Sequence, residues 1–316
     1  MKDKIVFFGR NKNYNITHLC YKELIKFIRD TQHEIVMTVI SDDDHGDPDT
    51  LESLAENAGV PWTSPPSNDV NDPIFVKKLT ELNPTIFITV QFPKIFKSEV
   101  LNIPKRGALN IHRGWPLRGG SIDERAIYYR ASQYNVILHH MTPGIDTGNI
   151  IGKVGFELSD NEDGYSLVKK ADEAGRKLFV KYFLPLIGYP LPFGEKQDLE
   201  MTTYGDKGSL SNKIDFSESS DNIERICRAF HHPRKLGAFI MVMGQKIYPI
   251  PPLKVIPESS KENPGTILAL TESSVVLATG DSKMALEKCH LGDKVPIHFG
   301  QFLIKKGFNV GDSLVS

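Results

Sequence analysis

The sequence predicts an α/β domain with a mostly parallel sheet, followed by a smaller domain built as a β-barrel. Over the first 190 residues, apolar β-branched runs alternate with stretches of helical period. After residue 237, short strand-like runs follow one another with turn signals between them. Strands that alternate with helices are typical of a parallel sheet covered on both faces, and closely spaced short strands are typical of a small barrel.

The predicted parallel sheet depends on five strands and three helices. The strands are apolar runs at Lys4–Gly9, Ile35–Ile40, Thr85–Val90, Gly107–Ile111 and Asn135–His140. Between them, apolar residues at helical spacing predict helices near Thr17–Asp30, Thr50–Ala58 and Pro73–Leu82. No GxGxxG follows the first strand, so the sequence lacks the fingerprint of a dinucleotide-binding site.

The middle of the chain predicts further helices and a domain boundary. Ser121 to Glu124 fits a capping box and should begin a helix that runs to about Arg130. Helical spacing predicts another helix over Asp163–Ile187. Positions 191–207 are rich in Pro, Gly and polar residues, and we interpret them as a linker. The predicted domains are therefore a catalytic domain over 1–190 and a C-terminal domain over 208–316.

The C-terminal domain is predicted to contain one amphipathic helix and several short strands. The helix covers Ser220–Phe230, with its apolar residues on one face. The strands are expected at Ala238–Met243, Lys246–Ile250, Thr266–Leu270, Val275–Thr279 and Met284–Leu286. Gly-containing turns separate them, as in a small barrel.

Composition and charge exclude several classes of protein. The net charge of the 316 residues is -1, so the chain offers no basic field for nucleic acid or a membrane surface. Three cysteines lie far apart without metal-ligand spacing, which predicts reduced thiols and no metal site. The charged, strand-like start and the lack of an apolar run of ~18 residues argue against a signal peptide and a membrane span. We expect a soluble, cytoplasmic protein, either a monomer or a homodimer.

Three polar residues at predicted strand ends form the candidate catalytic site: Asn110, His112 and Asp146. Asn110 and His112 are two residues apart, so on a strand their side chains point to the same face. Asp146 lies between Gly144 and Gly148, in a loop that can bend back toward that strand end. Each residue taken alone is more often structural. Because ligands bind at the carboxyl ends of strands in such sheets, we expect the three to line one crevice.

These residue types suit an acyl transfer that passes through a tetrahedral oxyanion. The Asn110 amide would donate to the oxyanion, and His112 would accept and return a proton near neutral pH. Asp146 would orient the imidazole or hold a relay water. The two His-His pairs of the chain do not predict a metal site, because adjacent residues of a strand point to opposite faces.

With these motifs the chain resembles the 10-formyltetrahydrofolate-dependent formyltransferase family over nearly its whole length. Asn110-Ile111-His112 matches the family's Asn-x-His, and Gly144-Ile145-Asp146-Thr147-Gly148 matches its aspartate loop. The family includes methionyl-tRNA formyltransferases and sugar-nucleotide N-formyltransferases. The resemblance implies a Rossmann-like catalytic domain, an OB-like C-terminal domain, and 10-formyltetrahydrofolate as co-substrate without a metal.

The same resemblance implies which residues hold the folate. The loop after the third main strand should line the pterin pocket, with Val90, Gln91, Phe92, Pro93 and Ile95. The remaining folate contacts are expected from Arg118, Gly119, Gly144 and Ile145. The chain departs from the family at Arg113-Gly114-Trp115-Pro116, where a Ser-Leu-Leu-Pro-like segment is usual. This departure falls on the expected acceptor pocket.

The charge distribution favours a small acceptor over tRNA. By the resemblance, tRNA-formylating members carry a basic insertion after the second strand, whereas positions 31–60 here contain eight acidic residues and no Lys or Arg. An acid run is usually a solvated loop, but it repels a polyanion. Arg113, Arg118 and Arg125 could meet a diphosphate.

We therefore expect formyl transfer from 10-formyltetrahydrofolate to a primary amine of a small acceptor, such as a nucleotide-linked amino sugar. Nucleic acid and membrane are not expected as partners. Three alternatives stay open: a methionyl-tRNA formyltransferase, a 10-formyltetrahydrofolate hydrolase, and a non-catalytic module that binds folate or a nucleotide sugar.

Overall fold

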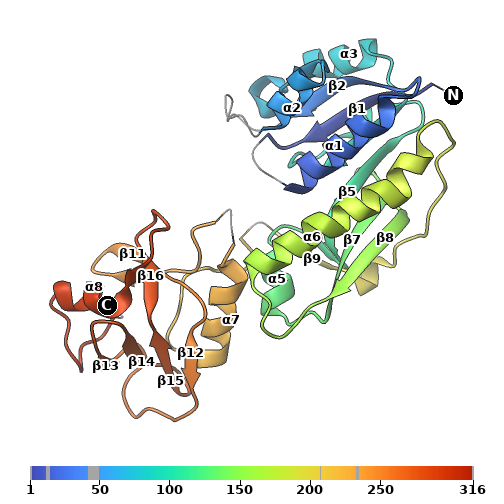
Figure 1. Ribbon diagram of the computed structural model, residues 1–316. Coiled ribbons are helices and arrows are strands. Elements are labelled where there is room, and N and C mark those ends of the chain that lie inside the picture. Colours follow the sequence, from blue (N-terminus) through green and yellow to red (C-terminus); the bar gives the residue numbers. More distant parts are fainter. Residues whose placement is uncertain (1, 12–14, 42–49, 207, 233–234, 315–316) are drawn as a thin grey trace. The chain divides into compact units, whose positions relative to one another are not determined.

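The computed structural model describes residues 2–11, 15–41, 50–206, 208–232 and 235–314 (Figure 1). Their internal contacts divide the chain into two compact units. The first contains residues 1–119, 133–157 and 169–205, and the second contains residues 120–132, 158–168 and 206–316. The domain limits expected at 190 and 208 stay a prediction.

One mixed sheet forms the centre of the first unit. Within the described residues its seven strands have the order β3-β2-β1-β4-β5-β7-β8. The strands are β1 (Lys4–Gly9), β2 (Glu34–Ile40), β3 (Trp62–Thr63), β4 (Ile86–Val90), β5 (Ala108–Trp115), β7 (Gln133–His140) and β8 (Ile150–Glu157). Pairs from β3 to β5 are parallel, and β7 and β8 join antiparallel to that edge. The prediction of a mostly parallel α/β sheet is confirmed.

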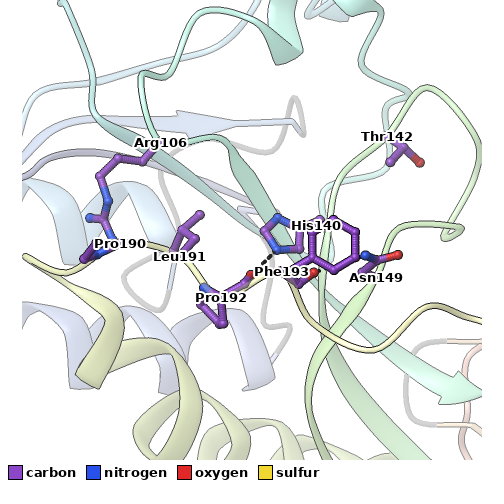
Figure 2. A pocket seen from close by; sticks show the side chains of 8 residues that line it. All are labelled: Arg106, His140, Thr142, Asn149, Pro190, Leu191, Pro192 and Phe193. Carbon is purple, nitrogen blue, oxygen red and sulfur yellow. Dashed lines mark hydrogen bonds between the residues drawn. The ribbon is translucent and has the colours of Figure 1, made fainter.

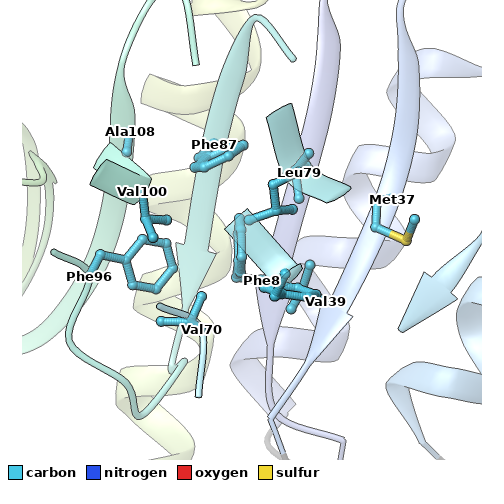
Figure 3. Packing of buried hydrophobic residues seen from close by; sticks show 11 residues of the cluster. Phe8, Met37, Val39, Val70, Leu79, Phe87, Phe96, Val100 and Ala108 are labelled. Atoms are coloured by element: carbon cyan, nitrogen blue, oxygen red, sulfur yellow. The ribbon is translucent and has the colours of Figure 1, made fainter. Parts of the chain in front are cut away.

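Alternating residues of β1 pack on opposite faces of this sheet. Phe7 contacts Tyr21 of α1 (Asn15–Ile28) with ring centroids 4.8 Å apart. On the other face, Phe8 meets Phe87 and Phe96 edge-to-face, each at 5.0 Å. Figure 3 shows this second cluster, which also buries residues of α3 (Pro73–Glu81) and α4 (Ser98–Leu101). Burial of apolar side chains on both faces is what holds a parallel sheet together.

The helices predicted from the sequence are present with different ends, whereas α4 and α8 (Phe299–Lys305) were not predicted. Helix α2 covers Leu51–Asn57, and Thr50 caps it by accepting from the backbone N–H of Ser53 at 3.1 Å. Helix α6 (Gly164–Leu178) continues as a π-helical turn, η2 (Phe179–Phe183), and a 3-10 turn, η3 (Leu184–Leu186). The expected single helix over Asp163–Ile187 is therefore three successive pieces.

The capping box predicted at Ser121 does not form. Helix α5 (Ile122–Tyr128) begins after Ser121, whose φ of 51° is left-handed and whose side chain makes no capping hydrogen bond. An N-cap residue needs an extended backbone for its hydroxyl to reach the first free N–H groups. The helix start was therefore correct, but the motif that suggested it was not.

The second unit contains antiparallel strands and helix α7 (Ser220–Phe230), as predicted. Over its described residues, one four-stranded sheet has the order β10-β11-β16-β17 and another has β12-β15-β14-β13. The first comprises β10 (Ile240–Val242), β11 (Gln245–Pro249), β16 (Lys288–His290) and β17 (Ile297–His298). The second comprises β12 (Lys254–Ile256), β13 (Ile267–Leu270), β14 (Val275–Ala278) and β15 (Lys283–Leu286), and α8 (Phe299–Lys305) follows.

Among the described residues, no helix has the length and apolar character needed to cross a membrane.

Candidate active site

Strand β5 positions Asn110 and His112 on one face of the sheet. Asn110 lies opposite Thr89 of β4 and opposite His139 of β7. The Thr89 hydroxyl donates to the Asn110 side-chain oxygen at 2.6 Å, which turns the amide nitrogen away from β4. The side-chain N–H groups of Asn110 therefore point toward β7 and the loop that follows it.

The loop between β7 and β8 brings Asp146 to these two residues. Asp146 Oδ2 lies 3.3 Å from His112 Nδ1, and the Asn110 amide nitrogen donates to Asp146 Oδ1 at 3.4 Å. The backbone N–H of Gly119 also donates to Oδ2, at 3.4 Å. Asp146 has a φ of 53°, a left-handed conformation that costs energy for a residue with a side chain. Three side chains from two segments thus meet at one point, as the sequence analysis expected.

His112 has an oxygen atom at each ring nitrogen. Its Nε2 donates to the backbone carbonyl of Leu117 at 2.7 Å, and its Nδ1 faces the Asp146 carboxylate. The side chain is 7% exposed, whereas that of Asp146 is 15% exposed. An imidazole between a carbonyl and a carboxylate is held in one orientation and can donate from both nitrogens when protonated.

His139 is a fourth member of the site that the sequence analysis missed. Its Nδ1 donates to the carbonyl of His140 at 2.7 Å, so its Nε2 accepts from the Asn110 amide at 3.1 Å. Nε2 also lies 3.7 Å from Asp146 Oδ1. Burial lowers the pKa of His139 from 6.5 to about 4, against the opposing effect of Asp146. The neutral ring is thus a fixed acceptor for Asn110.

The predicted folate loop leaves β4 through a left-handed residue, Gln91, with a φ of 58°. The Arg10 side chain donates to the Gln91 carbonyl at 3.1 Å, and the Thr17 hydroxyl donates to the Val90 carbonyl at 3.0 Å. Phe92 packs edge-to-face on Phe8 at 5.4 Å, so its ring belongs to the core. Pro93 and Ile95 are exposed. These contacts fix the backbone of the loop.

The other residues expected to hold folate lie around the aspartate loop. Arg118 belongs to the short strand β6 (Leu117–Gly119), and it donates to the carbonyl of Ile145 at 3.1 Å and to the Thr202 hydroxyl at 2.8 Å. Gly144 is exposed at the start of the loop. Arg118 and Gly119 thus contact the loop that carries Ile145 and Asp146.

Two of the arginines expected to meet a diphosphate are buried. Arg113 is 4% exposed and forms an ion pair with Asp172 of α6 at 3.2 Å, and Arg125 is 3% exposed. That prediction is wrong for both, because a bound diphosphate needs an accessible guanidinium. Arg113 and Trp115 belong to β5, which pairs with β7 beyond His112. The segment that departs from the family pattern therefore extends a strand.

A pocket of about 560 Å³ lies elsewhere in the first unit (Figure 2). It is lined by Arg106, His140, Thr142, Asn149, Pro190, Leu191, Pro192 and Phe193. His140 follows His139 on β7 and donates from Nε2 to the Pro192 carbonyl at 2.7 Å, and Arg106 forms an ion pair with buried Asp3. The polar groups of this pocket therefore tie chain segments together, and none of Asn110, His112 and Asp146 lines it.

An amide and an imidazole on β5, met by a carboxylate from the loop after β7 of a mostly parallel sheet, define an α/β acyl-transfer enzyme. Two family profiles give the particular family. The one described as "Formyl transferase" matches residues 4–183, and "Formyl transferase, C-terminal domain" matches residues 210–307. The chain belongs to the formyl transferase family, and the prediction of a formyltransferase is confirmed.

Curated relatives include methionyl-tRNA formyltransferases. That of Pseudomonas paraeruginosa is 27% identical over 293 residues, which cover 88% of this chain and 90% of the relative. That of Marinobacter nauticus is 30% identical over 249 residues, which cover 77% and 78%. Both relatives match along most of their length.

Solved structures with the same fold include sugar N-formyltransferases. The N-formyltransferase from Helicobacter canadensis, solved with folinic acid and dTDP-3-aminofucose, has a TM-score of 0.67 and 20% identity, and the match covers 92% of this chain and all of that one. The sugar 3N-formyltransferase WlaRD, solved with dTDP and a formylated tetrahydrofolate, has a TM-score of 0.68 and 19% identity, with 93% and 100% covered. At these identities the comparison concerns the fold.

Proposed function

We propose that this formyltransferase moves a formyl group from 10-formyltetrahydrofolate to the primary amine of a nucleotide-linked amino sugar. The observation that carries the chemistry is the convergence of His112 and Asn110 on the Asp146 carboxylate, at 3.3 and 3.4 Å respectively. The nitrogen of the acceptor attacks the formyl carbon, and the carbonyl oxygen becomes an oxyanion. Collapse of this intermediate breaks the bond to N10 of the folate, which leaves with a proton.

Each of the three side chains has one role in this reaction. Asn110 donates to the oxyanion through the N–H that now makes the longer contact, 3.4 Å to Asp146. His112 keeps its Nε2–H on the Leu117 carbonyl, so Nδ1 takes the proton that the amine loses and delivers one to the leaving nitrogen. Asp146 orients the imidazole and balances its charge.

The donor is assigned to the folate loop and the aspartate loop. Val90, Gln91, Phe92, Pro93 and Ile95 would line the pterin pocket, and their backbone is fixed by the packing of Phe92 and the bond to Gln91. Gly144, Ile145, Arg118 and Gly119 would complete it from the other loop. Support comes from two structures of the same fold, which were solved with folinic acid or a formylated tetrahydrofolate.

The acceptor is assigned from charge and from fold. The acidic residues of positions 31–60 are Glu34, Asp42, Asp43, Asp44, Asp47, Asp49, Glu52 and Glu56. The five at 42–49 lie outside the described residues. A region with this charge disfavours a phosphate backbone. Of the two structures described above, one was solved with dTDP-3-aminofucose and the other is a sugar 3N-formyltransferase, which supports the same acceptor class here.

Methionyl-tRNA is the second candidate acceptor. The specific observation in its favour is that the curated relatives described above, at 27% and 30% identity, are methionyl-tRNA formyltransferases.

Parallel reactions with different acceptors test the proposal. Purified protein is incubated with 10-formyltetrahydrofolate and either dTDP-3-aminofucose, charged initiator tRNA or no amine, and products are identified by mass spectrometry. We expect formylated sugar nucleotide, and at least about 100-fold less product with Asn110→Ala or His112→Ala. Formylation of tRNA alone would overturn the sugar assignment. Release of formate without an amine would instead identify a hydrolase.

A further inference from the structure

The segment that follows α6 binds the aspartate loop although its composition is that of a linker. Glu195 exchanges two backbone hydrogen bonds with Ile150, at 2.7 and 2.8 Å. Farther along, β9 (Thr203–Gly205) pairs in parallel with β6 (Leu117–Gly119). Residues 195–205 therefore contact the chain on both sides of the site, and all of them belong to the first unit.

Gln197 is the buried side chain of this segment and is 5% exposed. Its amide nitrogen donates to the carbonyl of Asp146 at 3.0 Å and to that of Gly148 at 2.6 Å. Its oxygen accepts from the indole N–H of Trp115 at 3.1 Å. An indole nitrogen can only donate, so Trp115 fixes which end of the Gln197 amide faces the loop.

The backbone of Asp146 needs such support. Its φ of 53° is left-handed, a conformation that a residue with a side chain adopts only when its surroundings hold it there. Its carboxylate contacts His112 at 3.3 Å and Asn110 at 3.4 Å, and both distances depend on where the backbone lies. Loss of the donors to two carbonyl groups would let the loop relax and move the carboxylate.

We propose that Gln197 is a positioning residue for the formyl transfer. Its hydrogen bonds to the loop keep the Asp146 carboxylate beside His112 and Asn110, and the Trp115 indole orients the Gln197 amide. The inference depends on formyl transfer at Asp146 and is independent of which amine is the acceptor. It predicts that turnover depends on Gln197 more strongly than substrate binding does, because the amide contacts the backbone of the loop.

Three variants separate positioning from general stability. Gln197→Met keeps the length of the side chain and removes both donors and the acceptor. Trp115→Phe removes only the N–H that orients the amide. Asn149→Ala is the matched control, because Asn149 also ties the loop to the same segment, through a bond to the Phe193 carbonyl at 3.1 Å, but does not contact Asp146.

With 10-formyltetrahydrofolate and dTDP-3-aminofucose, we expect kcat of Gln197→Met to fall by about 30- to 100-fold, with KM values within about 3-fold of wild type. Trp115→Phe should lose about 5- to 10-fold, and Asn149→Ala less than about 3-fold. Equal kcat in Gln197→Met and Asn149→Ala would overturn the inference.

A measurement without turnover distinguishes failure of this inference from failure of the proposed acceptor. The chain has two tryptophans, so ¹⁵N spectra contain two indole N–H signals, and Trp115→Phe assigns them. In Gln197→Met the Trp115 signal should move, and backbone amides of 144–149 should exchange faster than in wild type and Asn149→Ala. If exchange there is unchanged, Gln197 does not hold the loop. If wild type fails to formylate the sugar but exchange behaves as expected, only the acceptor is wrong.

Discussion

At the scale of single residues, the site depends on a histidine that stays neutral. The bond from His139 Nδ1 to a backbone carbonyl makes its Nε2 an acceptor for the Asn110 amide. A second proton on this ring would remove that acceptor and place two donors face to face. The Thr89 hydroxyl holds the other end of the same amide at 2.6 Å. The orientation of the Asn110 amide is thus fixed as long as His139 is uncharged.

The pKa of His139 predicts an acid-sensitive fold. Burial lowers this pKa from 6.5 to about 4. Between pH 6.5 and pH 4, His139 is therefore protonated in the unfolded chain but neutral in the folded chain. Stability should therefore be fully present above pH 6.5 and fall as the pH is lowered toward 4. The loss by pH 5 is on the order of 2 kcal/mol.

Urea unfolding of wild type and His139→Gln at pH 7.5 and pH 5 measures this contribution. The variant cannot titrate at this position, so its stability should fall less between the two pH values, by the amount just given. All other ionisable groups are common to both proteins. The same pH dependence in both would show that another group causes the acid sensitivity.

At the scale of elements, the two glycines of the aspartate loop have different tolerances. A Cβ on Gly148 would lie 1.9 Å from the backbone oxygen of His140, which cannot move without disturbing β7. A Cβ on Gly144 would lie 2.4 Å from the hydroxyl of Thr147, and its three nearest atoms all belong to that side chain, which pairs with the Thr142 hydroxyl at 2.8 Å. We expect Gly148→Ala to lower the free energy of unfolding by about 1–3 kcal/mol. Gly144→Ala should lower the free energy of unfolding by less. Urea titration of both variants measures the difference, and a Gly148→Ala protein at least as stable as Gly144→Ala would contradict the role of backbone crowding.

Strand β5 is joined to helix α6 by the buried ion pair of Arg113 and Asp172. Asp172→Asn leaves the Arg113 charge without its carboxylate in a low-dielectric interior, so we expect it to destabilise the fold by about 3–5 kcal/mol. Arg113→Met with Asp172→Leu removes both charges and should recover most of that loss. Thermal unfolding of the two proteins compares them. A single variant as stable as wild type would show that the pair is dispensable.

The sequence predicted elements with continuous apolar runs and missed those without them. Strand β1 has the predicted limits, Lys4–Gly9, because a buried central strand is apolar at nearly every position. Strand β8 was missed because only one of its eight residues is buried and Gly152 and Gly155 interrupt it. His139 was missed for another reason: its strand was predicted, but its place beside Asn110 follows from the antiparallel pairing of β5 with β7, which no local pattern indicates.

The candidate site was predictable in its three central residues and not in their support. Asn110 and His112 were indicated by their polar side chains two residues apart in an apolar run, although they lie inside β5 and not at its end, and Asp146 was indicated by its glycine-flanked loop. Gln197 lies in a segment rich in Pro and Gly, and its burial depends on contacts with a loop about fifty positions away. The charge of Arg113 suggested a ligand, whereas its position on the helix-covered face of β5 makes it structural.

At the scale of the whole molecule, the proposed chemistry belongs to the first unit. Asn110, His112, His139, Asp146 and Gln197 all lie in it. Both tryptophans, Trp62 and Trp115, lie in the same unit, and the second unit contains none. Tryptophan fluorescence therefore follows unfolding of the unit that carries the site.

This arrangement allows folate binding to be located without a transfer assay. A ligand that binds only the folded first unit stabilises it by RT ln(1 + [L]/Kd), about 2.7 kcal/mol at one hundred times Kd. Folinic acid should therefore raise the midpoint of the fluorescence-detected urea transition as its concentration rises. Phe193→Ala, an exposed change outside the proposed folate loops, is the control and should show the same shift. A fluorescence midpoint that does not respond to folinic acid would contradict the assignment of the folate to the first unit.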